Sequence, residues 1–500
     1  MTEITDFATI VLLVTAGFAL AVLSTKITAR VPVPAPAIFL LAAALVSDLW
    51  PRVYGEVPIK TVERIAVVAL IVILFNGGMD IGWRRFRAAA GPILSLGVIG
   101  TFATAGIVAA FAHYVLGFDW MLAGIVGAAL APTDPAVMFS VLGRREIAGR
   151  SGTTLEGEAG VNDPAGIALM LGMIELATHD GASPLVVLRE FVVEMTIGAA
   201  MGLLGALILV PLLRRVRLPS EGLYPVLTIA LAGALYAATS LGHGSGFLAV
   251  FMTGLFLGDA RTPYKGEIER FHGSLATLAE LVVFVALGLT VSIGGLSGRV
   301  WADGIALALV LALLARPLVV VGTLATAHLR WTERAFIAWA GLKGAVPILL
   351  AAFAVLGGVT GADRVYGIVF VVVLVSVIGQ GTLVPLVARV LHIPMHVRPS
   401  LPWQLTVGLT EEPQGAREFT VARGSRSEGH EIRDLPLGEH AWVTLIVRDG
   451  AAIQPSGSLR LKAGDRVLAL MERDDQRALA RLFEGGAHAV ATEPRTPPTE

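Results

Sequence analysis

A short acidic stretch interrupts one of the most apolar parts of the chain. It contains Glu156, Glu158, Asn162 and Asp163, and an uncharged apolar run follows it. On a helix, Glu158 and Asn162 share one face, and eight residues of helix place Asp163 about 12 Å along the axis. At that depth in a membrane, a carboxyl group usually marks the path of an ion or a proton. The alternative is a helix that starts in water, which suits Glu156 better than Asp163.

A second apolar run contains two prolines three residues apart, in the segment Ala131-Pro-Thr-Asp-Pro135. Each proline removes a helical hydrogen bond and clashes with a preceding carbonyl. We therefore expect the helix to unwind around Thr133 and Asp134. Unwound backbone inside a membrane is tolerated only where protein or a water-filled cavity satisfies it.

A matching break is expected much later, in the segment Gly341-Leu-Lys-Gly-Ala-Val-Pro347. The two breaks lie in the fifth and twelfth apolar segments, which predicts two repeats related by a shift of seven segments. Interrupted helices at corresponding positions of two halves indicate a binding site of a transporter near the membrane midplane. For either break considered alone, the alternative interpretation is a proline kink that serves only the packing of the helices.

Three further charges lie within apolar segments. Arg316 stands about midway along its segment and requires an anionic partner, for which Glu158 is the best candidate. Lys343 lies at the second break, and its alternative interpretation is a lysine that reaches the membrane edge. For Glu280, structural pairing and a functional role are equally supported, whereas His243 between two glycines is expected in a loop.

The composition is that of a membrane protein with many spans. The 500 residues are 55% hydrophobic and only 15% charged, with a mean hydropathy of +0.74, whereas ordinary globular chains carry about 25% charge. This excludes a soluble enzyme and a nucleic-acid binder. The absence of cysteine excludes a secreted disulfide scaffold, a thiolate metal site and a cysteine nucleophile.

We predict an all-α domain over residues 1–398 with about thirteen transmembrane helices, arranged as two inverted repeats with discontinuous crossing helices. About 20 apolar residues cross the ~30 Å hydrocarbon layer. The short ninth segment leaves twelve or fourteen spans open. The predicted segments are 7–25, 36–50, 59–76, 90–115, 121–143, 155–177, 187–213, 223–241, 246–258, 272–294, 301–326, 333–358 and 364–391.

Basic residues are concentrated in every second loop. The loops after odd-numbered segments hold clusters such as Arg84, Arg85 and Arg87, whereas the intervening loops hold few basic residues. Because basic residues next to spans stay in the cytoplasm, we expect the N-terminus outside and the C-terminus inside.

Residues 403–487 differ sharply in composition and predict a small cytoplasmic α+β domain. Strands are expected over 418–421, 441–447 and 466–471, and a helix over 475–483 with Asp474 or Asp475 as its N-cap. The segment carries no Gly-x-Gly-x-x-Gly loop and therefore lacks a dinucleotide fingerprint. Residues 488–500 are expected to be disordered.

Taken together, four motifs resemble the NhaP-type monovalent cation/proton antiporters over roughly residues 5–395. They are Thr133-Asp-Pro135, Glu158-x-x-x-Asn162-Asp163, Arg316-Pro317 and Gly344-Ala-Val-Pro347. The tail resembles the C-terminal half of the RCK regulator (TrkA-C). This combination is similar to the potassium/proton antiporters of bacterial inner membranes, which protect against alkali-cation excess and serve pH homeostasis.

The resemblance implies a homodimer with a moving core domain and assigns roles to several residues. Asp163 would carry cation and proton in turn, with Thr133 giving an oxygen to the transient K⁺ or Na⁺ and Asp134 beside it. Glu158, Asn162 and Arg316 would form a structural cluster. The Asn-Asp pair is the form associated with electroneutral exchange.

Three positions depart from the pattern of sodium-selective members. Asn76 stands where some of them have glutamate, Ala159 where they have a serine that ligates the ion, and Lys343 where arginine is usual. The loss of a carboxylate and a hydroxyl weakens tight Na⁺ coordination and favours K⁺.

One titrating carboxylate suffices for exchange, because a proton and a cation each neutralise the same charge. No cofactor is expected, and the tail is expected to bind a regulatory ligand, with a nucleotide as one candidate.

The main alternative function is that of a Na⁺/H⁺ antiporter of the same fold. An RCK-gated potassium channel is a weaker alternative, because the chain contains no selectivity-filter sequence of such a channel. An intramembrane aspartyl protease that uses Asp134 and Asp163 is also less well supported, because Pro135 and Pro164 are more typical of an unwound crossing.

Overall fold

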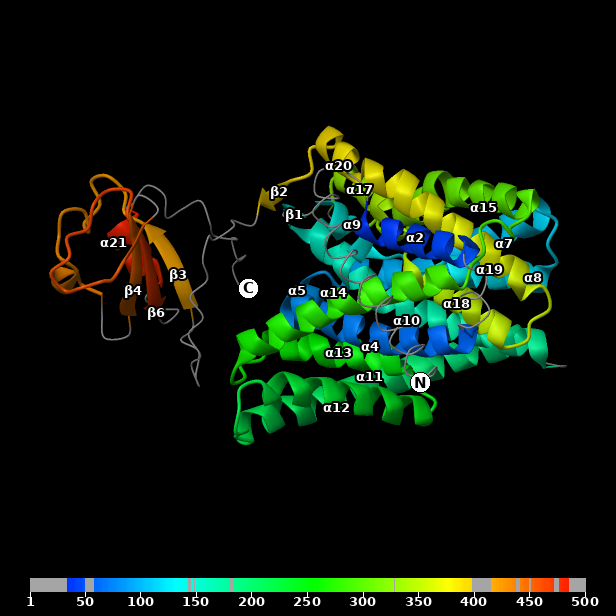
Figure 1. Ribbon diagram of the computed structural model, residues 1–500, viewed down its shortest axis with the longest axis horizontal. Helices are drawn as coiled ribbons and strands as arrows, with labels where there is room; N and C mark the ends of the chain where they lie inside the picture. The colour runs from blue at the N-terminus through cyan, green and yellow to red at the C-terminus, as the bar shows by residue number, and fades with distance from the viewer. Residues whose placement is uncertain are drawn as a thin grey trace, which may run out of the picture. The chain divides into compact units, whose positions relative to one another are not determined.

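The chain divides into two compact units, a helical unit of residues 1–261 and 265–404 and a smaller unit that consists mainly of residues 405–500. The computed structural model (Figure 1) describes residues 34–49, 58–142, 145–147, 149–179, 183–327, 329–397, 415–437, 441–448, 451–471 and 476–484. The predicted first segment, 7–25, and the expected N-caps Asp474 and Asp475 lie outside these residues.

Six helices of the helical unit pack on one another as a first group. They are α2 (Ala35–Leu49), α4 (Ile59–Ile81), α11 (Pro184–Arg215), α12 (Leu223–Leu241), α13 (Gly246–Asp259) and α14 (Lys265–Leu289). Glycines allow α4 and α13 to touch: a Cβ at Gly254 would lie 2.3 Å from the Phe75 carbonyl oxygen, and one at Gly78 would lie 2.4 Å from that of Phe251. Small residues of this kind are typical where membrane helices approach closely.

The second group contains the broken helices and three π-helical segments. Its elements are α5 (Trp83–Ala88), α6 (Ala90–Leu94), η1 (Ser95–Gly100), α7 (Thr101–Tyr114), α8 (Trp120–Leu130), α9 (Pro135–Leu142), α10 (Arg150–Thr178), α15 (Gly298–Val310), η2 (Leu311–Ala315), α16 (Arg316–Thr323), α17 (Trp331–Ala340), α18 (Ala345–Leu356), α19 (Ala362–Val375), η3 (Ser376–Gln380) and α20 (Gly381–Val390). The short strands β1 (Arg145–Ile147) and β2 (Met395–Val397) pair antiparallel.

Helix α10 corrects one expectation. Pro164 lies inside a continuous helix, not at an unwound segment, because a single missing N–H removes one hydrogen bond while the neighbouring turns remain paired. The helix is buried along most of its length, and packing against the surrounding elements stabilises the helical conformation on both sides of Pro164.

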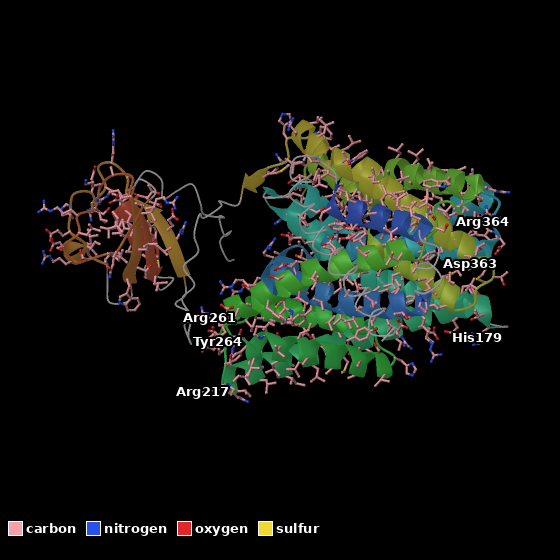
Figure 2. All side chains as sticks on the ribbon, in the orientation of Figure 1. His179, Arg217, Arg261, Tyr264, Asp363 and Arg364 are labelled. Atoms are coloured by element: carbon pink, nitrogen blue, oxygen red, sulfur yellow. The ribbon has the colours of Figure 1, made fainter. Side chains whose placement is uncertain are left out.

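Within the described residues, seven helices are long and apolar enough to cross a membrane, or eight if the bent pair α17 and α18 is one span. A mostly helical membrane unit is therefore confirmed, whereas the count of thirteen stays a prediction. Figure 2 shows Arg217 and Arg261, which follow α11 and α13, at one end of the helical unit, and His179, Asp363 and Arg364 at the other. Arg217 and Arg261 follow odd-numbered predicted segments, and the other three residues follow even-numbered ones. At these positions the two sets of loops therefore lie at opposite ends of the helical unit, as the prediction requires.

The second unit is a small antiparallel sheet with one helix. The strand order is β3-β6-β4-β5, and its core gathers Phe419, Ile446, Val467, Leu479 and Phe483. The elements are β3 (Gly415–Thr420), η4 (Ile432–Asp434), β4 (Ala441–Arg448), β5 (Ala451–Ile453), β6 (Arg466–Met471) and α21 (Gln476–Phe483). The predicted α+β character is confirmed, with the first strand starting three residues earlier than expected.

Candidate functional site

Two helices of the second group are interrupted, and their breaks contact each other. Helix α8 ends at Leu130 and α9 begins at Pro135, while α17 ends at Ala340 and α18 begins at Ala345 with a bend of 45° between them. The backbone N–H of Asp134 donates to the Leu342 carbonyl at 2.8 Å. Both predicted breaks are confirmed, and we call the two segments 131–134 and 341–344 the crossing.

Lys343 satisfies the carbonyls that the first break exposes. Its Nζ donates to the Ala131 and Pro132 carbonyls at 3.0 and 2.9 Å, and the residue is 3% exposed. A cation at these carbonyls offsets the negative end of α8. The lysine therefore points into the crossing and does not reach the membrane edge.

Gly344 lets the two breaks approach at the position of Asp134. A Cβ on Gly344 would lie 1.8 Å from Asp134 Oδ2 and 2.5 Å from the Asp134 Cβ. The second contact is with an atom fixed to the backbone, so rotation of the Asp134 side chain alone cannot make room. The Asp134 carboxyl group thus lies directly over the second break.

Glu158 and Arg316 form a buried, two-pronged ion pair, as predicted. Arg316 donates to the two carboxylate oxygens at 2.5 and 2.6 Å, and the residues are 1% and 5% exposed. Paired guanidinium and carboxylate groups of this geometry fix orientation as well as charge. The pair connects α10 to α16 beside the crossing.

The same network includes Thr133 and Asn162. The Thr133 hydroxyl donates to Glu158 Oε1 at 3.3 Å and accepts from Asn162 Nδ2 at 2.7 Å. The structural cluster of Glu158, Asn162 and Arg316 is therefore found together, with Thr133 as an additional member. An oxygen that Thr133 gives to an ion would be its backbone carbonyl or the remaining lone pair of its hydroxyl.

Asp163 lies beside this network in a buried position. It is 6% exposed, and within the described part of the chain its Oδ1 and the Oδ1 of Asn162 are buried without a hydrogen-bond donor. The charged groups that act on Asp163 are Asp134, Lys343 and Glu158. Buried acceptors without a donor are rare and require an explanation, and a bound cation or proton would supply one.

The remaining predicted site residues lie in different surroundings. Asn76 on α4 donates to Asp80 at 2.8 Å, and its own Oδ1 is buried without a donor among the described residues. Ala159 is buried on α10 and offers no polar side-chain atom. Glu280 on α14 interacts electrostatically with Asp134, and its Oε1 is likewise buried and unpaired in the described structure.

Two other sequence interpretations are settled by contacts at the ends of helices. Glu156 pairs with Arg85 at 3.1 Å with 29% of its side chain exposed, which agrees with a position at the wet end of α10. His243 lies in the loop between α12 and α13 with a φ of 55°, as expected.

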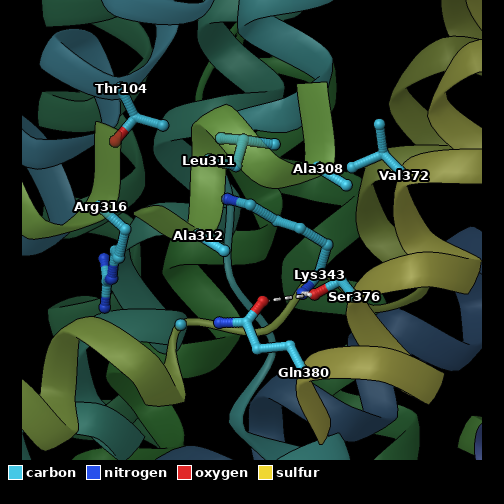
Figure 3. A pocket seen from close by; sticks show the side chains of 10 residues that line it. Thr104, Ala308, Leu311, Ala312, Arg316, Lys343, Val372, Ser376 and Gln380 are labelled. Atoms are coloured by element: carbon cyan, nitrogen blue, oxygen red, sulfur yellow. Dashed lines mark hydrogen bonds between the residues drawn. The ribbon is translucent and has the colours of Figure 1, made fainter. Parts of the chain in front are cut away.

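Sequence reasoning missed the polar residues of η3. Ser376 accepts from the Lys343 backbone N–H at 3.0 Å and donates to Gln380 at 3.2 Å, and Gln380 donates to the Trp339 carbonyl at 2.5 Å. Figure 3 shows Lys343, Ser376 and Gln380 around a small cavity that Arg316 also lines. Its volume of about 10 Å³ matches one water molecule. Two polar residues four apart in an apolar run were the available signal.

The residues of the crossing and of its neighbours lie in a part of the chain that matches a known protein family. A sequence model described as "Sodium/hydrogen exchanger, transmembrane" matches residues 4–390, and one described as "TrkA-C domain" matches residues 416–484. The chain is 32% identical over 471 residues to "K(+)/H(+) antiporter NhaP2" of Shewanella sp. (strain MR-4), covering 93% of this chain and 81% of the relative.

Two further similarities agree with this one. The chain is 32% identical to "K(+)/H(+) antiporter NhaP" of Alkalimonas amylolytica, covering 94% of this chain and 82% of that protein. The solved structure of the sodium proton antiporter MjNhaP1 from Methanocaldococcus jannaschii at pH 8 is similar in fold, with a TM-score of 0.65 and 24% identity over 75% of this chain and 99% of that one.

Proposed function

The chain belongs to the sodium/hydrogen exchanger family, and from this premise we propose that it exchanges K⁺ for H⁺ across a bacterial inner membrane. Its relatives named as K⁺/H⁺ antiporters are similar to it over more than nine tenths of its length. The proposal takes K⁺ and H⁺ as substrates and needs no resident cofactor.

The observation that carries the proposal is the Asp163 carboxyl group, which is buried beside the crossing and has one oxygen without a donor among the described residues. A bare carboxylate pays a large desolvation cost in the membrane interior. A proton or a cation each removes that cost, and the two compete for one negative charge. The crossing supplies the surrounding polar groups, with Thr133 and Asp134 in one break and Lys343 in the other.

Exchange of one K⁺ for one H⁺ on a single carboxylate moves no net charge. We therefore expect transport to be electroneutral, with Asp163 loaded by one ion on each half of the cycle. Glu158 and Arg316 already neutralise each other, so they add no charge to the moving site.

The direct test is Asp163→Asn in proteoliposomes with an internal pH-sensitive dye. The amide keeps the shape of the side chain but takes up no proton at neutral pH and carries no negative charge for a cation to neutralise. We therefore expect K⁺-driven proton movement to fall to the level of empty liposomes. Glu156→Gln, on the same helix at its wet end, is the matched control and should retain transport. Exchange that survives in Asp163→Asn would refute the proposal.

The choice of K⁺ rests on two side chains. Asn76 and Ala159 offer no carboxylate and no hydroxyl at positions where some sodium-selective family members have them, which favours the larger and less strongly hydrated cation. The alternative of Na⁺/H⁺ exchange is supported by the fold similarity to a sodium proton antiporter. Parallel K⁺ and Na⁺ titrations of the wild-type protein distinguish the two, and a lower half-saturating concentration for Na⁺ would favour the alternative.

Three broader features belong to the same proposal. The positive loops favour an outside N-terminus and a cytoplasmic C-terminal unit. We expect a homodimer, and we expect the C-terminal unit to regulate exchange in response to a small ligand. Blue native electrophoresis and labelling of single introduced cysteines from either side would test assembly and orientation.

A further inference from the structure

A second cavity lies away from the crossing, where the start of α10 meets α6, η1 and the end of α16. Its volume is about 320 Å³, which is at the lower end of the range for small-molecule sites. The polar side chains of its wall are Ser95, Arg150, Thr154, Thr323 and Thr326. The apolar residues that line the rest of the wall are Ala88, Ala89, Gly91, Pro92, Ala327 and Leu329.

The electrostatics of this cavity favour an anion. Helix α10 begins at Arg150, its N-cap Gly149 gives no side-chain hydrogen bond, and its first turn contains no acidic residue. The N–H groups and dipole of a helix N-terminus attract negative charge. Among the described residues that line the cavity there is no carboxylate to balance the Arg150 charge.

Thr154 provides an independent indication of a ligand. It is fully buried and lines the cavity, yet its hydroxyl has no hydrogen-bond partner in the described part of the chain. Leaving a buried hydroxyl unpaired costs about 1–3 kcal/mol. The neighbouring Ser95 hydroxyl is already used, since it donates to the Thr323 carbonyl at 3.0 Å. Thr154 and Arg150 thus remain as donors at one end of the cavity.

The surroundings indicate where such an anion comes from. Leu94 and Val321, near the cavity on α6 and α16, are 48% and 63% exposed, as expected for side chains that face lipid. Arg87, Arg150 and Arg330 are also exposed nearby. A boundary between an apolar surface and a row of arginines is the level at which phospholipid headgroups lie.

We propose that this cavity binds the phosphodiester group of an anionic membrane phospholipid. Arg150 and the start of α10 bind the phosphate oxygens, Thr154 donates to one of them from inside, and the acyl chains lie along the exposed apolar side chains of α6 and α16. Free phosphate has the same oxygen chemistry but would make no use of the apolar flank.

The test measures lipid retention and thermal stability of the purified full-length protein. In detergent, added phosphatidylglycerol should raise the melting temperature of the wild type and remain bound in native mass spectrometry, with phosphatidylcholine less effective. Removal of one charge-assisted hydrogen bond in Arg150→Gln should weaken phosphatidylglycerol retention about tenfold. Thr154→Val, which keeps the size of the side chain, should weaken it in the same direction.

Arg299→Gln is the matched control, because Arg299 is an exposed arginine in the first turn of another helix, α15, whose N-terminus is capped by Ser297. It should bind phosphatidylglycerol as the wild type does. Equal retention in the wild type and both cavity variants would overturn the proposal. Stabilisation by inorganic phosphate that phosphatidylglycerol does not exceed would overturn the lipid assignment in favour of a free anion.

Discussion

At the scale of single residues, the site contains two charges that pair with each other and one carboxyl group that we propose as the exchanging group. Glu158 and Arg316 are buried and bind each other through two hydrogen bonds. Asp163, in contrast, has one oxygen that receives no hydrogen bond from the part of the chain that the structure describes. Breaking a buried ion pair from one side leaves an uncompensated charge in a medium that solvates it poorly. Substitution of Glu158 should therefore lower mainly the stability of the protein, whereas substitution of Asp163 on the same helix should lower mainly transport.

Glu158→Ala should lower the free energy of unfolding by about 3–5 kcal/mol, because it strands the Arg316 guanidinium. Glu156→Ala removes a partly exposed pair with Arg85 and should cost about 0–1 kcal/mol. Thermal unfolding of the purified proteins in detergent measures both. A Glu158→Ala protein as stable as Glu156→Ala would show that the pair does not support the fold.

The C-terminal unit contains a comparable pair outside the membrane. Asp465 is 1% exposed, and burial alone would raise its pKa, but the hydrogen bonds from Arg448 at 2.7 Å and from the Lys462 backbone lower it overall. A lowered folded-state pKa stabilises the fold above the unfolded pKa of about 3.9, and this stabilisation is lost as pH falls through the folded value.

Asp465→Asn should therefore destabilise the sheet at pH 7 by about 2 kcal/mol and should have progressively less effect below pH 4. Hydrogen exchange of the β6 amides in the full chain, corrected for intrinsic rates, provides the measurement. The exposed residue Asp434 provides the control substitution, Asp434→Asn. An effect of Asp465→Asn that is the same at pH 3 and pH 7 would contradict this linkage.

At the scale of elements, the crossing depends on two unwound segments that fit closely. Asp134 and Leu342 share a backbone hydrogen bond, and Lys343 binds the carbonyls of the opposite break. Each break therefore satisfies polar groups of the other, which is how non-helical backbone is tolerated at membrane depth.

Gly344→Ala should disrupt this fit, because its Cβ would overlap the Asp134 side chain. We expect exchange to fall at least tenfold, since the overlap displaces the break that carries Thr133. Gly233→Ala on α12, where a Cβ meets nothing within 4 Å, should leave transport unchanged. Initial rates in proteoliposomes compare the two, and normal exchange by Gly344→Ala would show that the crossing tolerates this displacement.

The sequence identified both breaks because each carries prolines or glycines inside an apolar run, and these residues act locally. Pro164 shows the limit of that reasoning, since α10 continues through it where tertiary packing holds the helix. The pairing of Arg316 with Glu158 was predictable because a buried cation requires an anion. The contacts of Ser376 and Gln380 were not, since they depend on a π-helical turn in η3 that sets the direction of both side chains.

At the scale of the whole molecule, the chain combines a helical membrane unit with a small sheet unit that has its own core. The polar contacts described for the crossing all come from the helical unit. The membrane unit should therefore contain the exchange chemistry, with the sheet unit acting on its rate.

Deletion of residues 403–500 should leave K⁺/H⁺ exchange measurable while changing its dependence on pH or on cytoplasmic solutes. Proteoliposome assays across pH 6–9 on the full chain and the truncated chain provide the comparison, with gel filtration to establish that the truncated protein is folded. Complete loss of exchange in a well-folded truncated protein would mean that the sheet unit is part of the transport machinery.

The hydrogen bond between Asp134 and Leu342 and the contacts of Lys343 tie the two breaks together, so the halves of the crossing should travel as one body during turnover. A covalent crosslink between residues of the two breaks should then leave transport intact, whereas a crosslink from the crossing to α4 or α14 should arrest it. The natural chain contains no cysteine, so pairs of thiols for such crosslinks can be introduced without first removing any native one.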